Sequence, residues 1–403
     1  MNSLRFLQFS DLHAGRALQD ERIRLSEEQR STLRSDRLNC LESIVDVAIE
    51  EGIELVVLPG DLFEEDRVRK SEVRKIRRAF DALDPIPVII TPGDSDYHSP
   101  LSWYREDVMR KNQLESWPSN VHVFSEPGFE TKQIEALDGL RVSGFAYQGD
   151  RNRSTFPDTD AVLNRSSRVD LLLLHGVLDA SDPSSGDDVY SFSEQVVRKV
   201  PARYVAMGHT HQYREVRGEG TVHGAFAGSP MGMHGSETGE RNILIGELTD
   251  EGVPASSLEK RSVSPRRLFE LEIEQESDIS APRFRRRVQE RFDEEGVRTE
   301  DLVYLRIHGA DPGREVLGSK VLQSFLGTYF HVELDASRTR PLLDAEVGAE
   351  GEQSGTTEDQ FVREMLDRLD EASSEEQKEI VLKALRMGRS AFRTEDVSLD
   401  HVL

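Results

Sequence analysis

Five short segments of the chain combine aspartate and histidine residues in a way that could hold metal ions. The segments are Asp11-Leu12-His13, Gly60-Asp61, Gly93-Asp94-Ser95-Asp96, His175-Gly176 and Gly208-His209-Thr210-His211. Each follows a run of apolar residues, which predicts a buried strand just before it. Because open α/β sheets bind ligands at the carboxyl ends of their strands, we expect these side chains to lie close together.

The chemistry of such a cluster depends on its mixture of donor atoms. Carboxylate oxygens and imidazole nitrogens suit Mn²⁺, Fe²⁺ or Zn²⁺, and they suit Mg²⁺ less well because of the imidazoles. Two such ions about 4 Å apart can clamp a phosphate, activate a water molecule and stabilise the departing oxygen. Asp61 is the best candidate for a carboxylate that bridges both ions. One segment alone is weak evidence, since an isolated Asp-x-His is usually a turn, but a series after five predicted strands is much stronger.

The elements that must position these segments alternate between strand and helix through the first two thirds of the chain. The expected strands are 5–9, 53–58, 87–91, 121–124, 140–146, 170–174, 204–207, 221–227 and 242–248. The expected helices are 36–50 and about 68–83. This alternation predicts a mixed α/β domain built in layers.

The last third of the chain has a different texture. After a polar stretch at 250–267, the pattern predicts strands at 268–273, 302–307 and 330–334 and helices at 281–293 and 315–327, which form a small α+β unit. Residues 343–358 resemble a flexible linker. Two amphipathic helices then close the chain, and Thr357-x-x-Gln360 and Ser374-x-x-Gln377 look like their capping boxes.

The composition of the chain narrows the class of protein. Its 403 residues suffice for two or three domains, and no apolar stretch reaches the length of about 18 residues that a membrane span requires. The N-terminus lacks the layout of a signal peptide. The single cysteine, Cys40, excludes intrachain disulfides and a cysteine-based zinc site, and its helical context predicts a buried structural thiol. We expect a cytoplasmic protein.

The charge of the chain is strongly acidic. The net charge is −24, with 75 acidic against 51 basic residues, which argues against unassisted wrapping of DNA. Abundant Asp and Glu with little Lys suggests a source adapted to high salt, where ions screen the charge. Full stability at low ionic strength, with no gain in molar salt, would contradict that hypothesis.

The ordered series resembles the calcineurin-like metallophosphoesterases, whose pattern is Asp-x-His, Gly-Asp, Gly-Asn-His-Asp/Glu, a later His and Gly-His-x-His. Within them the chain looks most like the SbcD-type DNA double-strand-break repair exonuclease subunits. The residues that carry this resemblance are Phe9-Ser10-Asp11-Leu12-His13, Gly60-Asp61-Leu62-Phe63, Gly208-His209-Thr210-His211 and Gly228-Ser229-Pro230. It implies an α/β fold with layers in the order α-β-β-α, a small capping domain and C-terminal helices.

The resemblance also implies a role for each ligand. One metal ion would be held by Asp11, His13, Asp61 and His211, and the other by Asp61, Asp94, His175 and His209. The implied cofactors are two divalent ions, Mn²⁺ above all. The implied reaction is hydrolysis of DNA phosphodiesters, from ends or at hairpins, in double-strand-break repair.

By the same resemblance, the chain divides into four parts. They are a nuclease domain at 1–265, a DNA-capping domain at 266–342, a linker at 343–358 and a helical segment at 359–403. In the SbcD family such a helical segment binds an SMC-like ATPase of the SbcC type, and residues 359–389 are its counterpart here. The implied partners are therefore DNA ends, this ATPase and a second copy of the chain, although the apolar faces of these helices also fit packing on the chain's own core.

One segment departs from the family pattern. The family has Gly-Asn-His-Asp where this chain has Gly93-Asp94-Ser95-Asp96. Asp94 can still bind a metal, but its added negative charge lowers the Lewis acidity of the ion and repels phosphate. Ser95 stands at the position of the catalytic histidine, and a hydroxyl is a poor proton donor near neutral pH. Loss of a general acid typically costs about 10²–10⁴ in rate.

Three interpretations of this departure stay open. The nuclease is weak but real; or His98, three residues further on, supplies the missing imidazole; or the chain is a non-catalytic subunit that binds metal and DNA. His98 is more easily explained as a surface loop residue, whereas for Ser95 a helix-capping role and a chemical role explain the residue about equally well. A phosphodiesterase that acts on small molecules is a further alternative, which the capping domain and the terminal helices disfavour.

Two basic runs are candidates for DNA contact. Arg283, Arg285, Arg286, Arg287 and Arg291 cluster on the predicted helix at 281–293, where phosphate contact would explain them. Acidic residues follow closely, so a solvated helix face explains this cluster equally well. The second run comprises Arg67, Arg69, Lys70, Arg74, Lys75, Arg77 and Arg78. It follows the Asp61 strand and is better placed for a substrate.

Overall fold

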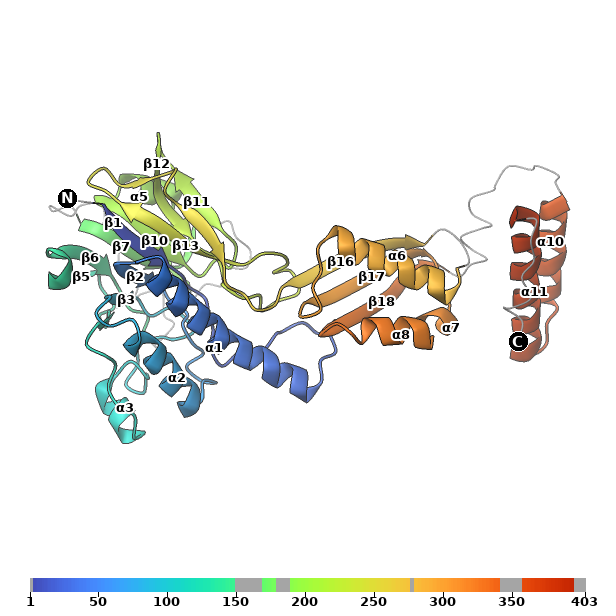
Figure 1. Ribbon diagram of the computed structural model, residues 1–403, viewed down its shortest axis with the longest axis horizontal. Helices are drawn as coiled ribbons and strands as arrows, with labels where there is room; N and C mark the ends of the chain where they lie inside the picture. Colours follow the sequence, from blue (N-terminus) through green and yellow to red (C-terminus); the bar gives the residue numbers. More distant parts are fainter. Residues whose placement is uncertain (1–2, 149–168, 179–188, 276–278, 341–356, 395–403) are drawn as a thin grey trace. The chain divides into compact units, whose positions relative to one another are not determined.

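The computed structural model describes residues 3–148, 169–178, 189–275, 279–340 and 357–394 (Figure 1). These residues form two compact units. The first comprises the described residues of 1–270, 297–304 and 327–333, and the second those of 271–296, 305–326 and 334–403. The four-part division expected from the sequence stays a prediction, and residues 343–356 of the expected linker lie outside the described residues.

The first unit contains two large sheets. One sheet has six strands, in the order β15 (Glu259–Ser262), β13 (Asn242–Leu248), β1 (Leu4–Gln8), β2 (Leu55–Leu58), β3 (Val88–Ile90) and β4 (Val121–Val123). Strands β1 to β4 run parallel to one another, whereas β13 and β15 pair in antiparallel fashion. The carboxyl ends of β1, β2 and β3 therefore lie at the same edge of this sheet.

The second sheet has seven strands. Its order is β11 (Arg214–Arg217), β12 (Thr221–Phe226), β10 (Ala202–Gly208), β7 (Val169–His175), β6 (Leu140–Gly144) and β5 (Glu130–Ile134), with β14 (Val253–Pro254) paired to β12. Its central strands β6, β7, β10 and β12 are parallel. A separate pair is formed by β8 (Val177–Leu178) and β9 (Ser191–Phe192).

The helices cover the outer faces of these two sheets. They are α1 (Glu27–Glu50), α2 (Lys70–Asp81), α3 (Glu106–Lys111) and α5 (Glu194–Lys199), with a short 3₁₀ turn at Glu135–Leu137. Apolar residues of α1, α2 and α3 pack on the first sheet, and those of α5 pack on the second. Between the sheets lies a third apolar cluster that includes Phe6, Leu171 and Tyr204. The expected α-β-β-α layering is confirmed.

The remaining described elements include a three-stranded sheet in the order β16 (Leu268–Gln275), β17 (Leu302–Ala310) and β18 (His331–Arg340). The other elements here are the helices α6 (Ala281–Glu294), α7 (Arg314–Leu317), α8 (Lys320–Leu326), α10 (Thr357–Asp370) and α11 (Glu375–Thr394). The single helix expected at 315–327 is wrong, because Gly318 interrupts it and Ser319 caps the new helix by accepting a hydrogen bond from the Leu322 amide.

Candidate metal centre

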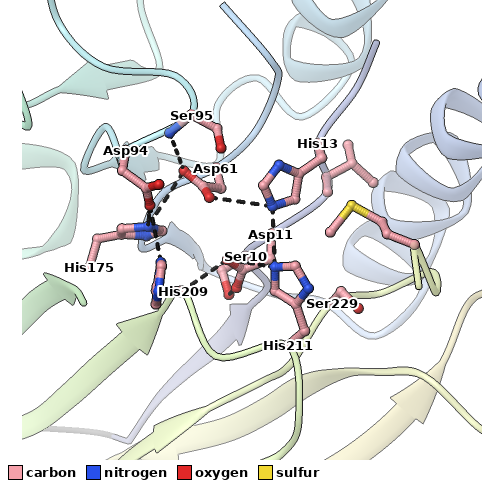
Figure 2. A network of polar contacts seen from close by, with 12 residues as sticks. Ser10, Asp11, His13, Asp61, Asp94, Ser95, His175, His209, His211 and Ser229 are labelled. Carbon is pink, nitrogen blue, oxygen red and sulfur yellow. Dashed lines mark hydrogen bonds and ion pairs between the residues drawn. The ribbon is translucent and has the colours of Figure 1, made fainter. Parts of the chain in front are cut away.

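The seven expected metal ligands come together in two groups (Figure 2). One group contains Asp61, Asp94, His175 and His209, and the other contains Asp11, His13 and His211. Within each group the donor atoms lie within 4.8 Å of one another. They converge because each residue stands at or just after the carboxyl end of β1, β2, β3, β7 or β10, so that both sheets contribute.

Asp61 belongs to one group and also faces the other. Its Oδ2 atom is 3.3 Å from Nε2 of His13, and its Oδ1 atom is 3.5 Å from Nε2 of His175. One carboxylate thus faces a histidine of each group with a different oxygen. This is the geometry that a carboxylate bridging two metal ions requires.

The imidazoles of the Asp11 group are held by two carboxylates that the sequence did not single out. Nδ1 of His13 lies 2.8 Å from Glu64, and Nδ1 of His211 lies 2.8 Å from Glu237. A nitrogen this close to an ionised carboxylate carries the proton, so Nε2 of each ring is the atom left for a metal. The two Nε2 atoms face each other at 3.3 Å, a separation at which their lone pairs repel unless a proton or a metal ion lies between them.

The second group is arranged in the same way. Nδ1 of His175 lies 2.9 Å from the carbonyl oxygen of Pro59, and Nε2 of the same ring faces Asp94 at 2.8 Å. The same oxygen of Asp94 lies 3.0 Å from Nδ1 of His209. Both donor sets, imidazole nitrogens with carboxylate oxygens, fit a borderline divalent ion such as Mn²⁺, Fe²⁺ or Zn²⁺.

The backbone is strained where these ligands are attached. Of the six non-glycine residues with positive φ in the described part of the chain, four are candidate ligands: Asp11 (56°), His13 (48°), Asp61 (57°) and His209 (96°). Such conformations are sparsely populated and tend to collect at functional sites. The strained backbone thus occurs at members of both ligand groups.

Two glycines leave room for candidate ligands that other parts of the chain supply. A Cβ atom on Gly60 would lie 2.1 Å from Nδ1 of His175, and φ at this residue is +93°. A Cβ atom on Gly93 would lie 2.3 Å from Oδ1 of Asp61. Any side chain at either position would push a ligand out of place, which explains the Gly-Asp pairs in the sequence.

The charges in this site are buried and interdependent. Burial, together with the neighbouring carboxylates, raises the pKa of Asp61 well above its ordinary value despite the opposing effect of His175. Burial lowers the pKa of His13 below its usual value, in spite of the hydrogen bond to Glu64. Hydrogen bonds from His175 and His209 outweigh burial and hold the pKa of Asp94 well below its ordinary value. So many buried carboxylates repel one another, and bound cations would relieve that repulsion.

Asp96 holds the two aspartate loops together from beneath. Its carboxylate accepts hydrogen bonds from the backbone amides of Asp61 (3.1 Å), Leu62 (2.8 Å) and Gly93 (2.6 Å), and from the hydroxyl of Tyr104 (2.6 Å). The side chain is fully buried. Asp96 therefore fixes the positions of the neighbouring ligands without offering itself as one.

Ser95 contacts the candidate ligands through its backbone amide. Its amide donates to Oδ1 of Asp61 at 2.9 Å, and within the described residues its hydroxyl has no hydrogen-bond partner. No helix begins here, since the next one starts at Glu106, so the helix-cap explanation is wrong. The side chain is nevertheless carried by the same loop as Asp94 and lies beside Asp61 (Figure 2).

His98 lies in a different environment. It lines an open surface pocket of about 520 Å³ with Arg105, Arg110, Glu126 and other residues, none of which is among the seven candidate ligands. Its backbone amide donates to the carbonyl oxygen of Tyr147. Its proposed catalytic role stays a prediction, and its surroundings match the alternative of a surface loop residue.

The arginines proposed to contact DNA differ in whether other side chains of the protein pair with them. On α6, Arg286 pairs with Glu290, and Arg287 donates to Gln275 and to the carbonyl oxygen of Glu274. On α2, Arg74 and Arg78 are exposed, and no ion pair engages them within the described residues. Arg283 of α6 is likewise exposed and unpaired within that part of the chain.

Comparison with known proteins identifies the family. A model of the calcineurin-like phosphoesterases matches residues 4–213, just over half of the chain. The chain belongs to the calcineurin-like phosphoesterase family. As a member of that family it is a metal-dependent phosphoesterase, and the two groups of side chains are candidate ligands for its divalent ions.

Individual relatives are more distant. An uncharacterized metallophosphoesterase of Bacillus subtilis, YhaO, is 27% identical over 62% of this chain and 59% of its own length. The DNA double-strand break repair protein Mre11 of Sulfurisphaera tokodaii is 24% identical over 57% of this chain and 54% of its own. The match thus spans less than two thirds of either relative. A solved dimetal phosphatase from Danio rerio is 12% identical, with a TM-score of 0.38, over 65% of this chain and 99% of that one, and we draw nothing from so low a likeness.

Among the described residues, no helix is both long enough and apolar enough to cross a membrane. Cys40 is a buried free thiol, as its helical context predicts.

Proposed function

We propose that this phosphoesterase is a nuclease subunit that hydrolyses DNA phosphodiesters at double-strand breaks with two bound Mn²⁺ ions. The observation that carries the proposal is the pair of ligand groups, with Asp61 facing a histidine of each, in a sequence order that resembles the SbcD-type exonucleases. The similarity to a DNA double-strand break repair protein supports the same substrate class. Mn²⁺-dependent degradation of linear duplex DNA tests the proposal, with Asp61→Ala as the matched inactive variant.

The direction from which a phosphate would approach follows from the exposure of the ligands. Asp11 and His175 are fully buried, whereas the side chains of Asp94, His209 and His211 are 24%, 21% and 22% exposed. The substrate would therefore meet the site on the side of these three residues. Bound metal ions would supply a hydroxide nucleophile and neutralise the charge on the phosphate.

The chain's own residues set the rate of that reaction. Asp94 brings a negative charge to the open side, which disfavours an approaching phosphate. Ser95, beside Asp61, has a hydroxyl where the family has an imidazole. A hydroxyl is a poor proton donor to the leaving oxygen. A slow nuclease is the expected result. Because of Ser95, a subunit that binds metal and DNA without cutting it is the second candidate.

The basic face of α2, formed by Lys70, Arg74, Lys75 and Arg78, is the proposed surface for the DNA backbone. Lys70, Arg74 and Arg78 follow one another at intervals of four residues, and Lys75 lies three residues before Arg78, so each of the four side chains has a basic neighbour on the helix surface. The helix begins nine residues after Asp61 and is tied to the loop after β1, because Glu72 pairs with Arg34, which in turn donates to the carbonyl oxygen of Gly15. A cationic surface thus lies on the same unit as the metal centre.

Replacing Arg74, Lys75 and Arg78 with glutamine should weaken DNA binding and its salt dependence together. The slope of log K against log salt should fall by about 0.9 for each phosphate that these side chains no longer neutralise. Binding to a labelled duplex is measured over a salt series without metal, so that no cutting occurs. The control is Arg283, Arg286 and Arg287 of α6 changed to glutamine, which alters the net charge equally. A larger decrease of slope in the α6 variant would move the DNA-binding surface to that helix.

The two C-terminal helices are the proposed docking segment for an SMC-like ATPase, as the resemblance implies. Met365 of α10 and Leu385 of α11 are buried, and the rings of Phe361 and Phe392 lie 5.7 Å apart. Other apolar side chains stay exposed, including Ile380 at 62%. The helical pair therefore keeps apolar surface that its own packing does not cover. A homodimer completes the proposed assembly.

Deleting residues 350–403 should abolish binding of the ATPase and leave the metal centre intact. The deletion removes both helices and no candidate ligand. Co-purification with the ATPase and Mn²⁺ binding are measured on the same preparations. Retained ATPase binding would show that the docking surface lies elsewhere in the chain.

A further inference from the structure

A buried carboxylate beyond the family-matched segment reaches the metal centre. Glu237 lies in a loop that follows Gly228-Ser229-Pro230, whereas the family match ends at residue 213. The side chain is only 5% exposed. Its Oε1 atom lies 2.8 Å from Nδ1 of His211, on the side of the ring opposite to the one that faces His13.

The other oxygen of Glu237 is held by three donors. Oε2 accepts hydrogen bonds from the hydroxyl of Ser229 (3.0 Å), the amide of Met233 (2.9 Å) and Nη2 of Arg241 (3.3 Å). Nη2 of Arg241 also donates to the carbonyl oxygen of His211. A carboxylate with this many donors is ionised and cannot turn, so it can only accept the proton of the imidazole.

The loop that carries Glu237 is fastened to the strand end that carries the other ligands. The buried guanidinium of Arg37 donates to the carbonyl oxygens of Leu12 (3.2 Å), Met231 (3.3 Å) and Gly232 (3.1 Å). Leu12 stands between Asp11 and His13. One side chain of α1 thereby links the Glu237 loop to the segment that carries Asp11 and His13.

We propose that Glu237 is a positioning residue that makes His211 a metal ligand by fixing its tautomer, a role that rests on the proposed two-metal site. With the proton held on Nδ1, the lone pair of Nε2 points toward the donor atoms of the Asp11 group. Glu64 does the same for His13, at 2.8 Å from its Nδ1. The first metal ion is thus bound by two histidines that are each oriented by a carboxylate, one of them supplied from outside the matched segment.

Glutamine at position 237 tests the tautomer directly. The amide oxygen would have to satisfy Ser229, Met233 and Arg241, all of which donate. The amide NH₂ would then face His211 and require an acceptor at Nδ1, which moves the imidazole proton to Nε2, where it competes with the metal ion. The opposite orientation of the amide sets its NH₂ against these three donors.

The experiment compares Glu237→Gln with the unchanged chain and with a control. Glu240→Gln changes the same group three residues away, where the side chain is 56% exposed and pairs with Arg267 instead of a histidine. Calorimetric Mn²⁺ titration of the metal-free full chain gives the number and affinity of bound ions. Nitrogen NMR of the imidazoles gives the tautomer of His211 without metal.

Glu237→Gln is expected to weaken one of two Mn²⁺ ions by about 10–100-fold, as loss of an outer-shell partner does. The other ion is expected to bind as before, and His211 is expected to change tautomer. Glu240→Gln should match the unchanged chain. Two unaltered Mn²⁺ affinities with an unaltered tautomer in Glu237→Gln would overturn the inference, as would an unchanged chain that binds no Mn²⁺.

A second variant guards against misfolding. If Glu237→Gln lowers the melting temperature of the metal-free protein, the same measurements are made on Glu64→Gln, which alters the carboxylate partner of His13. Glu64 is 16% exposed and lies nearer the surface. It is expected to weaken the same ion, and full retention of both ions would again overturn the inference. A chain that shows these metal effects but cuts no DNA contradicts only the proposed nuclease function.

Discussion

Replacing Ser95 with histidine is expected to raise the rate of DNA hydrolysis by about 10²–10⁴-fold, the usual contribution of a general acid. The backbone at this position is already fixed, because the Ser95 amide donates to Asp61 and its carbonyl oxygen accepts from Glu65. Its hydroxyl has no partner in the described part of the chain, so the substitution breaks no hydrogen bond there. An imidazole here would be carried by the same loop as Asp94, whose side chain is on the open side of the site.

Single-turnover cleavage of a labelled duplex at saturating Mn²⁺ measures this gain, and Ser95→Ala is the control. The alanine variant should cut as slowly as the unchanged chain, since the hydroxyl is expected to add little. If Ser95→Ala were slower and Ser95→His no faster, the serine itself would take part in the reaction and the family comparison at this position would be misleading.

Replacing Asp61 with asparagine is expected to stabilise the metal-free protein and to remove most of its response to Mn²⁺. Asparagine tolerates the φ of 57° and can still accept the Ser95 amide through its side-chain oxygen. The substitution removes a carboxyl group that is costly to ionise, because burial raises its pKa well above the ordinary value. It also removes a carboxylate that faces a histidine of each ligand group.

Thermal unfolding with and without Mn²⁺ measures both effects in the same samples. One bound ion at 100 times its Kd stabilises the folded state by about 2.7 kcal/mol, so the unchanged chain should gain visibly in melting temperature. The asparagine variant should start higher in chelator and gain much less. An equal gain in both proteins would mean that Asp61 is not a shared ligand. The rate of DNA hydrolysis by Asp61→Asn should fall further than the loss of about 10–100-fold that follows removal of an outer-shell partner.

The sequence predicts the part of this site that depends on strand ends. β1, β2, β3, β7 and β10 contain short apolar runs, and the parallel arrangement within each sheet gathers that sheet's ligands at one edge. Edge strands without apolar residues cannot be predicted in this way. An example is β15, whose sequence is Glu259-Lys260-Arg261-Ser262 and whose residues are all exposed. The helix α1 begins at Glu27 rather than 36, because the capping box of Ser26 and Gln29 supports polar first turns that have no apolar periodicity.

The supporting residues of the site could be predicted much less well. Glu64 follows Asp61 closely, so its proximity to the site could have been guessed from spacing alone. Glu237 reaches His211 only because the chain returns through an irregular loop, and no periodicity marks such a position. The positive φ values at Asp11, His13 and His209 are also invisible in the sequence, since these residue types occur at many ordinary positions.

The most direct test of the proposed function is the Mn²⁺-dependent cutting of end-labelled linear duplex DNA by the unchanged chain and by Asp61→Ala. A small phosphodiester, bis(p-nitrophenyl) phosphate, is assayed beside it. We expect slow release of labelled nucleotides that requires Mn²⁺, is abolished by chelator and is absent from Asp61→Ala. Hydrolysis of the small ester with no cutting of DNA by any preparation, including Ser95→His, would contradict the assignment as a DNA nuclease.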